Sequence, residues 1–323
     1  RRREFFGILG GAAAAWPLAA RAQQPAMPAI GFLNSQSPEM FVVPLRGFRE
    51  GLKDAGYVDG ENVTIEYRWA EGVYDRLPAL AADLVSRKVD VIVSQAPPAA
   101  RAAKSATSTI PIVFAIGTDP VAEGLVASLA RPGGNLTGVT LLSADLMAKR
   151  FDLISELVPQ VRHFALLVNP GNPNFWIGAA QEVARAKGRE LQILKAKTER
   201  EIDEAFASIV QLRVGALVVG DDTFFSQRRE QIAALAARHH IPAIGFLRNF
   251  PEAGGLISYG ASLTSAYRQV GAYVGQILKG AKPAALAVQQ PVKFDMVLNM
   301  KTAKALGLSI SPLVLAQADE VIE

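Results

Sequence analysis

The chain of 323 residues contains no cysteine. Disulfides, thiol nucleophiles and cysteine-ligated metal sites are therefore excluded. Histidine is scarce as well. His239 and His240 are neighbours at the end of a predicted helix, and His163 precedes a predicted strand. This spacing does not suit a set of metal ligands or a catalytic base. We therefore predict a fold that is held together by packing and contains no metal.

Familiar enzyme motifs are also missing from the sequence. It has no G-x-x-x-x-G-K-[ST] phosphate loop, no G-x-G-x-x-G after the first predicted strand, no G-x-S-x-G elbow and no H-E-x-x-H motif. The adjacent carboxylates of Asp221 and Asp222 would suit acid–base chemistry only if a partner group stood opposite them. We predict no cofactor and no catalytic residue, which favours a binding protein over an enzyme.

Residues 1–22 have the pattern of an export signal. Consecutive arginines at positions 1–3 precede paired phenylalanines, a mostly apolar run follows, and Ala20–Ala22 offers small residues for cleavage. A membrane-spanning helix needs about 20 apolar residues, whereas this run is shorter and Pro17 interrupts it. We predict a twin-arginine-type signal that is cleaved near Ala22, and hence a periplasmic protein. A short amphipathic helix would explain neither the paired arginines nor the small residues.

The charge balance argues against nucleic acid as a partner. The formal net charge is +4, but residues 1–22 carry four arginines and one glutamate, so the remaining chain is left at +1. A chain this close to neutral, with no local cluster of Lys and Arg, lacks the basic field that nucleic-acid binding needs. Because half of the residues are apolar and 20% are charged, the chain is able to bury a sizeable core.

Beyond the signal, the sequence predicts two similar α/β lobes. Short runs rich in Val and Ile alternate with amphipathic stretches, which is typical of βαβ units and a parallel sheet. The plan repeats, because Ile30–Asn34 corresponds to Ala165–Asn169 and Val89–Ser94 corresponds to Gly215–Gly220. We predict two Rossmann-like lobes with a ligand cleft between them.

The late segments are too few for a third core and should complete these two lobes. We assign residues 27–142 and about 250–282 to lobe 1, and residues 143–249 and about 288–323 to lobe 2. The chain is then expected to cross between the lobes near Ser143, near Phe246–Phe250 and again within 281–291, and these crossings would form a hinge.

Candidate ligand contacts lie where the predicted strands end, since ligands of open parallel sheets bind outside the carboxyl ends of the strands. Nearly all of these ends carry small polar residues, which supply side-chain donors and free backbone N–H groups for a carboxylate. Asp119 and Asp221 add negative charge suited to an ammonium, so an amino acid would use both kinds of group. Phe246 and Tyr259 would supply aromatic walls, although core packing explains Phe246 equally well. The strand ends are residues 34–36, 94–97, 117–120, 169–172, 220–223 and 246–248.

The same residue types are ordinary helix caps and turn formers. Ser37–Pro38 and Asp119–Pro120 have the form of a cap followed by proline at the first helical position. The functional interpretation therefore depends on the whole set of strand ends, and capping stays open as the alternative for each member.

Several longer blocks resemble the ABC-transporter substrate-binding proteins, a family that includes tryptophan- and tyrosine-binding members. The blocks are Arg2–Phe5, Gly51–Tyr57, Glu61–Val63, Glu66–Trp69, Asp119–Val121, Gly124–Val126, Arg131–Gly138 and Gly255–Gly260. The resemblance covers essentially the whole chain after the signal, and Arg131–Gly138 combined with Asp119–Pro120 is its most specific part. It implies the type I periplasmic-binding fold, with a three-segment hinge and a ligand enclosed by lobe closure.

The resemblance also implies that both lobes contact the ligand. The matching positions are Asn34, Ser35, Ser94, Gln95, Thr118, Asp119, Asn169, Asn172, Asp221 and Tyr259. The implied ligand is an aromatic amino acid or a related aromatic carboxylate, and the implied partner is an inner-membrane permease that is powered by a separate ATPase. We predict a monomeric, exported solute receptor. Two alternatives are an exported α/β enzyme that acts in the cleft and a sensory module that presents its ligand to a receptor kinase.

Overall fold

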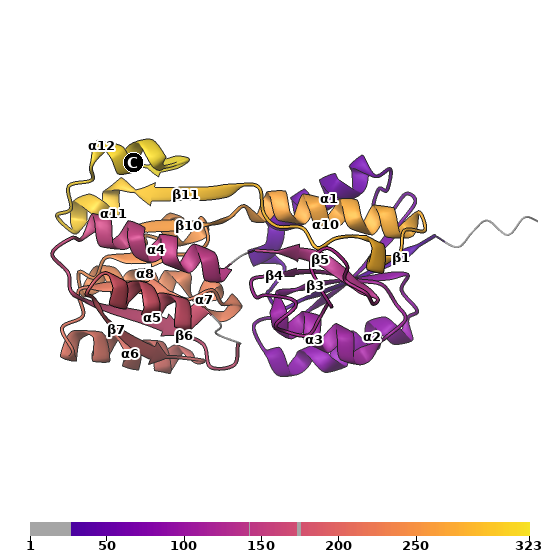
Figure 1. Cartoon of the computed structure of the whole chain (residues 1–323), viewed down its shortest axis with the longest axis horizontal. Coiled ribbons are helices and arrows are strands. Elements are labelled where there is room, and N and C mark those ends of the chain that lie inside the picture. Colours follow the sequence, from indigo (N-terminus) through magenta and orange to yellow (C-terminus); the bar gives the residue numbers. More distant parts are fainter. Residues whose placement is uncertain (1–26, 142, 173–175) are drawn as a thin grey trace, which may run out of the picture.

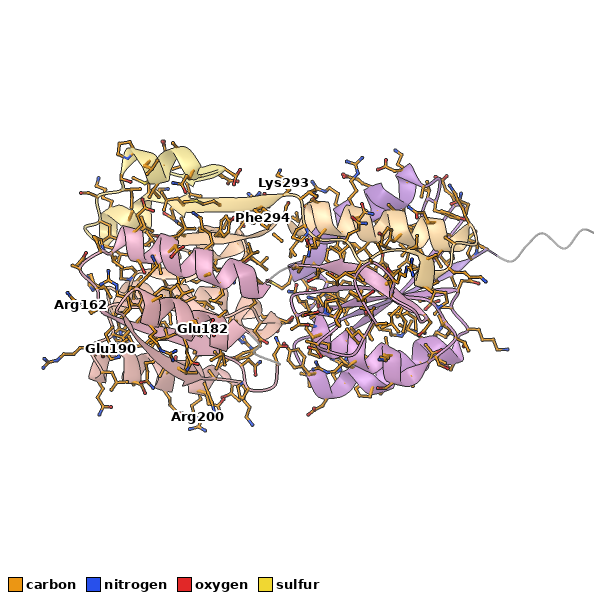
Figure 2. All side chains as sticks on the ribbon, in the orientation of Figure 1. Arg162, Glu182, Glu190, Arg200, Lys293 and Phe294 are labelled. Carbon is orange, nitrogen blue, oxygen red and sulfur yellow. The ribbon has the colours of Figure 1, made fainter. Side chains whose placement is uncertain are left out.

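The computed structural model describes residues 27–141, 143–172 and 176–323, which form two α/β lobes that lie side by side (Figure 1). The predicted export signal, residues 1–22, lies outside the described residues. None of the helices in the described ranges is long and apolar enough to cross a membrane. Charged side chains such as Arg162, Glu190 and Arg200 point outward from lobe 2 (Figure 2).

Lobe 1 is built on a parallel sheet in the order β2-β1-β3-β4-β5. Its strands alternate between two apolar faces, with Ile30 and Phe32 on one side and Leu33 on the other. Helices α1 and α10 cover the first face, and α2 and α3 cover the second (Figure 1). The strands are β1 (Ala29–Asn34), β2 (Thr64–Trp69), β3 (Val91–Gln95), β4 (Ile112–Ile116) and β5 (Leu136–Thr140), and the helices are α1 (Val42–Asp54), α2 (Leu77–Ser86), α3 (Ala96–Ala106) and α10 (Leu263–Leu278).

Lobe 2 has a seven-stranded sheet in the order β12-β11-β10-β9-β8-β6-β7, in which only the β10–β11 pair is antiparallel. Helices α4, α5, α11 and α12 pack on one face, and α6 to α9 pack on the other. The strands are β6 (His163–Val168), β7 (Glu190–Lys195), β8 (Ala216–Val219), β9 (Ala243–Gly245), β10 (Ile257–Ala261), β11 (Phe294–Asn299) and β12 (Glu320–Ile322). The helices are α4 (Ser143–Leu157), α5 (Trp176–Ala186), α6 (Glu199–Gln211), α7 (Thr223–Gln227), α8 (Arg229–Arg238), α9 (Asn249–Glu252), α11 (Met300–Ala305) and α12 (Pro312–Gln317).

The chain crosses between the lobes three times, and one crossing differs from the prediction. The first crossing follows β5, and the third lies between Gln289, which bonds to Gly138 of lobe 1, and β11 of lobe 2. The second crossing is at Ser262, between β10 and α10, and not at Phe246–Phe250. The assignment of residues 250–261 to lobe 1 is therefore wrong, because β10 pairs with β9 and β11 inside the second sheet. Lys293 and Phe294 mark the returning third segment (Figure 2).

Glycine allows α1 and α10 to approach each other closely on lobe 1. A Cβ atom on Gly51 would lie 1.9 Å from the carbonyl oxygen of Arg268, and one on Gly271 would lie 2.2 Å from that of Phe48. Both obstacles are backbone atoms of the facing helix, so a side chain would push the two helices apart. This contact fixes α10 against lobe 1 although β10, which precedes it, belongs to lobe 2.

We expect the substitution Gly51→Ala to lower the free energy of unfolding by about 2 kcal/mol, because overpacking outweighs the better helix propensity of alanine. Chemical denaturation would measure the loss. Gly178→Ala on α5 is the matched control, since a Cβ atom there meets nothing within 4 Å. Equal stability of the two variants would contradict the close-approach argument.

Candidate ligand-binding site between the lobes

A pocket between the lobes, here called the inner pocket, collects strand ends and helix starts from both sheets. Lobe 1 contributes the ends of β1, β3 and β4 together with the first turns of α10, and lobe 2 contributes α4 and the ends of β8 and β9. The lining residues are Gln36, Gln95, Ala96, Pro97, Ala115, Gly117, Leu141, Leu263 and Tyr267 from lobe 1, and Leu146, Arg150, Asn172, Asp221, Asp222, Thr223, Phe246, Leu247 and Ala261 from lobe 2. The pocket therefore lies where a parallel sheet is expected to hold its ligand.

Arg150 of α4 provides the buried positive charge of this pocket. Its side chain is only 1% exposed, and its Nε donates to the backbone oxygen of Tyr259 at 2.6 Å. Nη1 and Nη2 pair with the two carboxylate oxygens of Asp221 in a bidentate ion pair, with 3.2 Å between Nη2 and Oδ2. The guanidinium carbon also lies 5.9 Å from the centroid of the Phe246 ring. These contacts hold the Arg150–Asp221 pair in one orientation on the pocket wall.

Asp222 is surrounded by donors from both lobes. Oδ1 accepts from the Asn169 side chain at 3.0 Å and from the Phe224 N–H at 2.8 Å, the second being the N-cap bond of α7. Oδ2 accepts from Asn172 at 3.0 Å and from the Tyr74 hydroxyl at 2.9 Å. Burial still raises the pKa of Asp222, although these hydrogen bonds oppose the shift. Because Tyr74 belongs to lobe 1, its bond with Asp222 joins the two lobes.

Tyr74 itself is partly buried in the interface, and the pKa of its phenol lies well above the usual value, first because of desolvation and then because of the nearby Asp222 charge. It therefore stays protonated and donates its hydrogen bond across the physiological range. A second contact between the lobes lies nearby, where Arg229 Nη1 approaches the Met40 sulfur at 2.8 Å.

The structure brings only some of the predicted ligand contacts to the pocket surface. Gln95, Asn172, Asp221 and Phe246 line the inner pocket. Five other predicted ligand contacts are buried near the strand ends and are not among the described lining residues of the inner pocket. They are Asn34, Ser35, Ser94, Thr118 and Asn169.

Two of the buried residues have identifiable local roles. Asn34 Oδ1 accepts from the Gln36 N–H at 2.8 Å, and Ser35 Oγ donates to the Gln95 carbonyl at 3.1 Å. These bonds fix the loops that carry Gln36 and Gln95 into the pocket.

Asp119 and Tyr259 lie elsewhere, because within the described ranges they line neither the inner pocket nor the cleft described below. Asp119 is exposed, and its Oδ1 accepts from the Val121 N–H at 2.8 Å, which is the capping role that the sequence left open. The Tyr259 ring stacks on Phe294 at a centroid distance of 6.1 Å, and only its backbone oxygen reaches Arg150.

The start of α3 offers less to an anion than a typical helix N-terminus. Ala96 has φ of 68°, a backbone conformation that favours glycine, and Pro97 and Pro98 follow it. Proline lacks an N–H group, so these two positions remove donors that would otherwise face the pocket. Lobe 1 therefore offers fewer backbone N–H donors to a ligand carboxylate than the sequence analysis predicted. The guanidinium of Arg150 on lobe 2 is then the main group that could bind such a carboxylate.

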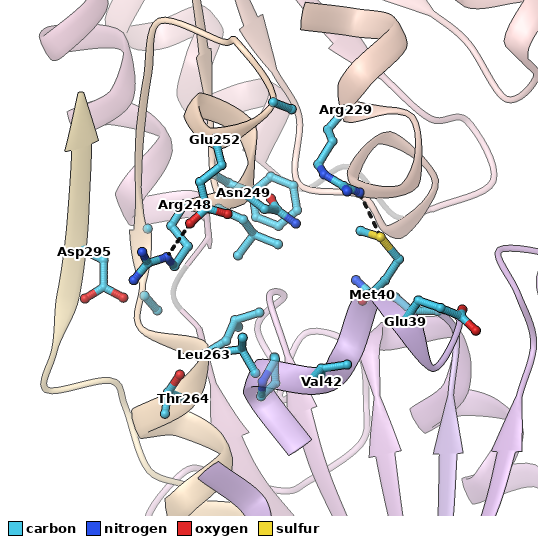
Figure 3. Close-up of a pocket in the computed structure, with 18 of the residues that line it drawn as sticks. Glu39, Met40, Val42, Arg229, Arg248, Asn249, Glu252, Leu263, Thr264 and Asp295 are labelled. Atoms are coloured by element: carbon cyan, nitrogen blue, oxygen red, sulfur yellow. Dashed lines mark hydrogen bonds and ion pairs between the residues drawn. The ribbon is translucent and has the colours of Figure 1, made fainter. Parts of the chain in front are cut away.

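The larger space beside the inner pocket, here called the outer cleft, has a volume of about 570 Å³ (Figure 3). Met40 and Val42 form its lobe 1 side, Arg229, Arg248, Asn249 and Glu252 form its lobe 2 side, and Asp295 lies on β11. Both spaces are lined by Gln36, Phe246, Leu247, Ala261 and Leu263. The outer cleft thus leads from the surface to the inner pocket. Among the described residues, no group of three or more acidic or histidine side chains is placed to hold a metal ion.

Two α/β lobes that share a pocket and are linked by three crossings define a bilobal ligand-binding protein with the type I periplasmic-binding fold, which solved structures of similar proteins share. Residues 38–322 match the family model described as ABC transporter substrate binding protein, and the chain belongs to that family. The predicted fold class and family are thereby confirmed. This is a family of substrate-binding proteins and not of enzymes.

Individual relatives carry names or titles that mention ligands. A tyrosine-binding protein of Clostridioides difficile is 28% identical over 266 residues, which is 81% of this chain and 76% of the relative. A domain from Streptococcus pneumoniae solved with L-Trp is 28% identical and has a TM-score of 0.85, covering 91% of this chain and 99% of that one. A conserved domain protein of Vibrio cholerae is 30% identical with a TM-score of 0.86 over the same shares.

Proposed function

We propose that this chain is the extracytoplasmic receptor of an ABC importer and that it binds an aromatic amino acid in the inner pocket. The observation that carries the proposal is the buried Arg150–Asp221 ion pair on the pocket wall. An α-amino acid has an ammonium and a carboxylate side by side, and such a zwitterion matches an acid and a base that are also side by side. The ammonium would bind Asp221 and the carboxylate would bind Arg150.

Arg150 retains donors for this role. A guanidinium has five N–H groups, and the hydrogen bonds to Tyr259 and Asp221 use three of them. Asn172 adds an acceptor for the ammonium, because its Oδ1 is buried without a hydrogen-bond partner in the described structure. The family and its tyrosine- and tryptophan-binding relatives support the aromatic side chain.

Lobe closure is the mechanism that this geometry favours. In the present arrangement the lobes touch through Tyr74 and Asp222, and about 70 Å³ of space remains in the inner pocket. Pockets that enclose small molecules usually measure about 300–1,000 Å³, so the lobes must separate before an amino acid enters. Contacts from both lobes would then favour reclosure by their differential binding energy. The permease would recognise the closed form and take up the ligand unchanged.

Calorimetric titration of the purified protein with L-tyrosine, L-tryptophan and L-phenylalanine tests the proposal. We expect saturable binding of one aromatic amino acid per chain and recovery of the ligand unchanged by mass spectrometry. L-alanine and L-leucine serve as controls that share the zwitterion without the ring, and they should bind more weakly. Chemical conversion of the ligand, or failure of all aromatic amino acids to bind, would refute the proposed function.

A further inference from the structure

Tyr267 lines the inner pocket, and its buried hydroxyl has no hydrogen-bond partner among the described residues. The residue is 1% exposed, and no hydrogen bond to its hydroxyl is formed within the part of the chain that the structure describes. Burial raises the pKa of this phenol well above its usual value, so it remains a neutral group with one donor and free acceptor sites. A buried polar group that lacks a partner costs free energy, and a ligand that supplies the partner recovers it.

Tyr267 lines the pocket from lobe 1, beside several apolar side chains. It stands one helical turn beyond Leu263 on α10, and both residues line the pocket together with Ala115 and Leu141 of lobe 1. The charged groups Arg150, Asp221 and Asp222 line the pocket from lobe 2. A zwitterion that binds these charges therefore directs its side chain toward lobe 1, where the ring would lie against apolar side chains.

Aromatic packing holds Tyr267 in place. The Phe41 ring meets it edge to face at a centroid distance of 4.8 Å, and Phe32 lies 6.4 Å away. Phe41 and Phe32 are themselves fully buried. The hydroxyl is thus presented by a rigid support and needs little reorganisation when a ligand arrives, which is the condition for a selective contact.

Resting on the proposed function, we propose that the Tyr267 hydroxyl hydrogen-bonds to a polar atom on the ligand's aromatic ring, either the phenol of tyrosine or the indole N–H of tryptophan. Tyr267 is then a specificity-determining residue. It favours rings that carry a hydroxyl or an N–H over the unsubstituted ring of phenylalanine, which would leave the hydroxyl buried and unpaired. Such selection against a ligand that lacks the hydrogen-bonding group is stronger than selection by size alone.

The experiment is a calorimetric comparison of L-tyrosine, L-tryptophan and L-phenylalanine on the wild-type chain and on Tyr267→Phe. We expect the wild type to bind L-tyrosine or L-tryptophan at least about tenfold more tightly than L-phenylalanine. In Tyr267→Phe the preferred ligand should lose about tenfold in affinity, while L-phenylalanine changes by less than about twofold. The ligand that loses more identifies the ring atom involved.

Tyr273→Phe is the matched control on the same helix. Its hydroxyl already donates to the Ala287 carbonyl at 2.6 Å and lies outside the inner-pocket lining as described, so its removal should leave the three affinities in their wild-type ratio. Equal affinities in the wild type, or an equal loss for all three ligands in Tyr267→Phe, would overturn this inference while leaving the proposed function in place. If none of the three binds to the wild type, the proposed function fails and this inference fails with it.

Discussion

Replacing Arg150 with methionine is expected to lower the free energy of unfolding by about 3–5 kcal/mol, which is the largest effect that we predict for a single substitution. Methionine fills a similar volume but leaves Asp221, which is 10% exposed, without its bidentate partner. The backbone oxygen of Tyr259 loses a donor as well. Urea denaturation at neutral pH would measure the loss. Because the carboxylate of the proposed ligand binds Arg150, aromatic amino acids should also stop binding.

The double variant Arg150→Met with Asp221→Leu separates the two roles of Arg150. Removing both charges leaves no uncompensated buried ion, so most of the lost stability should return. Ligand binding should stay lost, since the pocket wall no longer matches a zwitterion. If the double variant were as unstable as Arg150→Met alone, the penalty would arise from packing and not from the unpaired carboxylate.

The sequence predicted the lobes well because their strands and helices obey local periodicity. The prediction placed β10 in the wrong lobe, because local periodicity does not show which sheet a strand joins. Ile257–Ala261 and Leu263–Leu278 are separated by one residue and read as a single βα unit, yet the strand pairs in lobe 2 and the helix packs on lobe 1. The close glycine contacts between α1 and α10 hold the helix on lobe 1. These contacts join positions more than 200 residues apart, such as Gly51 and Arg268, so local sequence does not reveal them.

Part of the lining of the candidate pocket was predicted from the sequence, but several of its side chains were not. Strand ends located Gln95, Asn172 and Asp221, because the carboxyl ends of parallel strands meet at one edge. Arg150 lies in the middle of a helix, far from any strand end. The sequence feature that could have identified Arg150 is its position on the apolar face of α4, which it shares with the buried residues Met147, Phe151 and Ile154. A charge in such a stripe must find a buried partner.

Tyr74 and Tyr267 gave weaker signals. Tyr267 follows Leu263 and precedes Val270 on the apolar face of α10, so from sequence it looks like an ordinary core residue. Only the missing partner of its hydroxyl marks it as different. Tyr74 lies in a short 3-10 helix, and its contact with Asp222 depends on how the two lobes meet, which no local pattern encodes.

Replacing Asp222 with alanine is expected to lower the free energy of unfolding by about 3 kcal/mol. The change removes the acceptor of four donors, one of which is the Phe224 N–H that forms the N-cap bond of α7, and each lost hydrogen bond contributes about 0.5–1 kcal/mol. Three of these donors belong to lobe 2 and one belongs to lobe 1. Denaturation therefore reports mainly the loss inside lobe 2, while small-angle scattering of the ligand-free protein reports the contact between the lobes.

Tyr74→Phe isolates the contact between the lobes, because it removes the 2.9 Å bond to Asp222 and leaves the three lobe 2 donors of that carboxylate in place. Both variants should give a more open ligand-free protein in scattering, but Tyr74→Phe should cost about 1 kcal/mol of stability or less. An Asp222→Ala protein as compact as the wild type would show that closure does not depend on this bond.

The pH dependence of the free energy of unfolding provides a second, independent test of the role of Asp222. Because burial raises its pKa in the folded protein above the unfolded value of about 3.9, the folded state holds the proton more tightly. The stability that this adds is fully present below the unfolded pKa and is lost as the pH rises through the folded pKa. Asp222→Ala lacks the titrating group, so the stability difference between wild type and variant should be larger at pH 4 than at pH 7. A difference that instead grew with pH would mean that the hydrogen bonds from Asn169, Tyr74 and Asn172 outweigh burial and hold the pKa of Asp222 below its unfolded value.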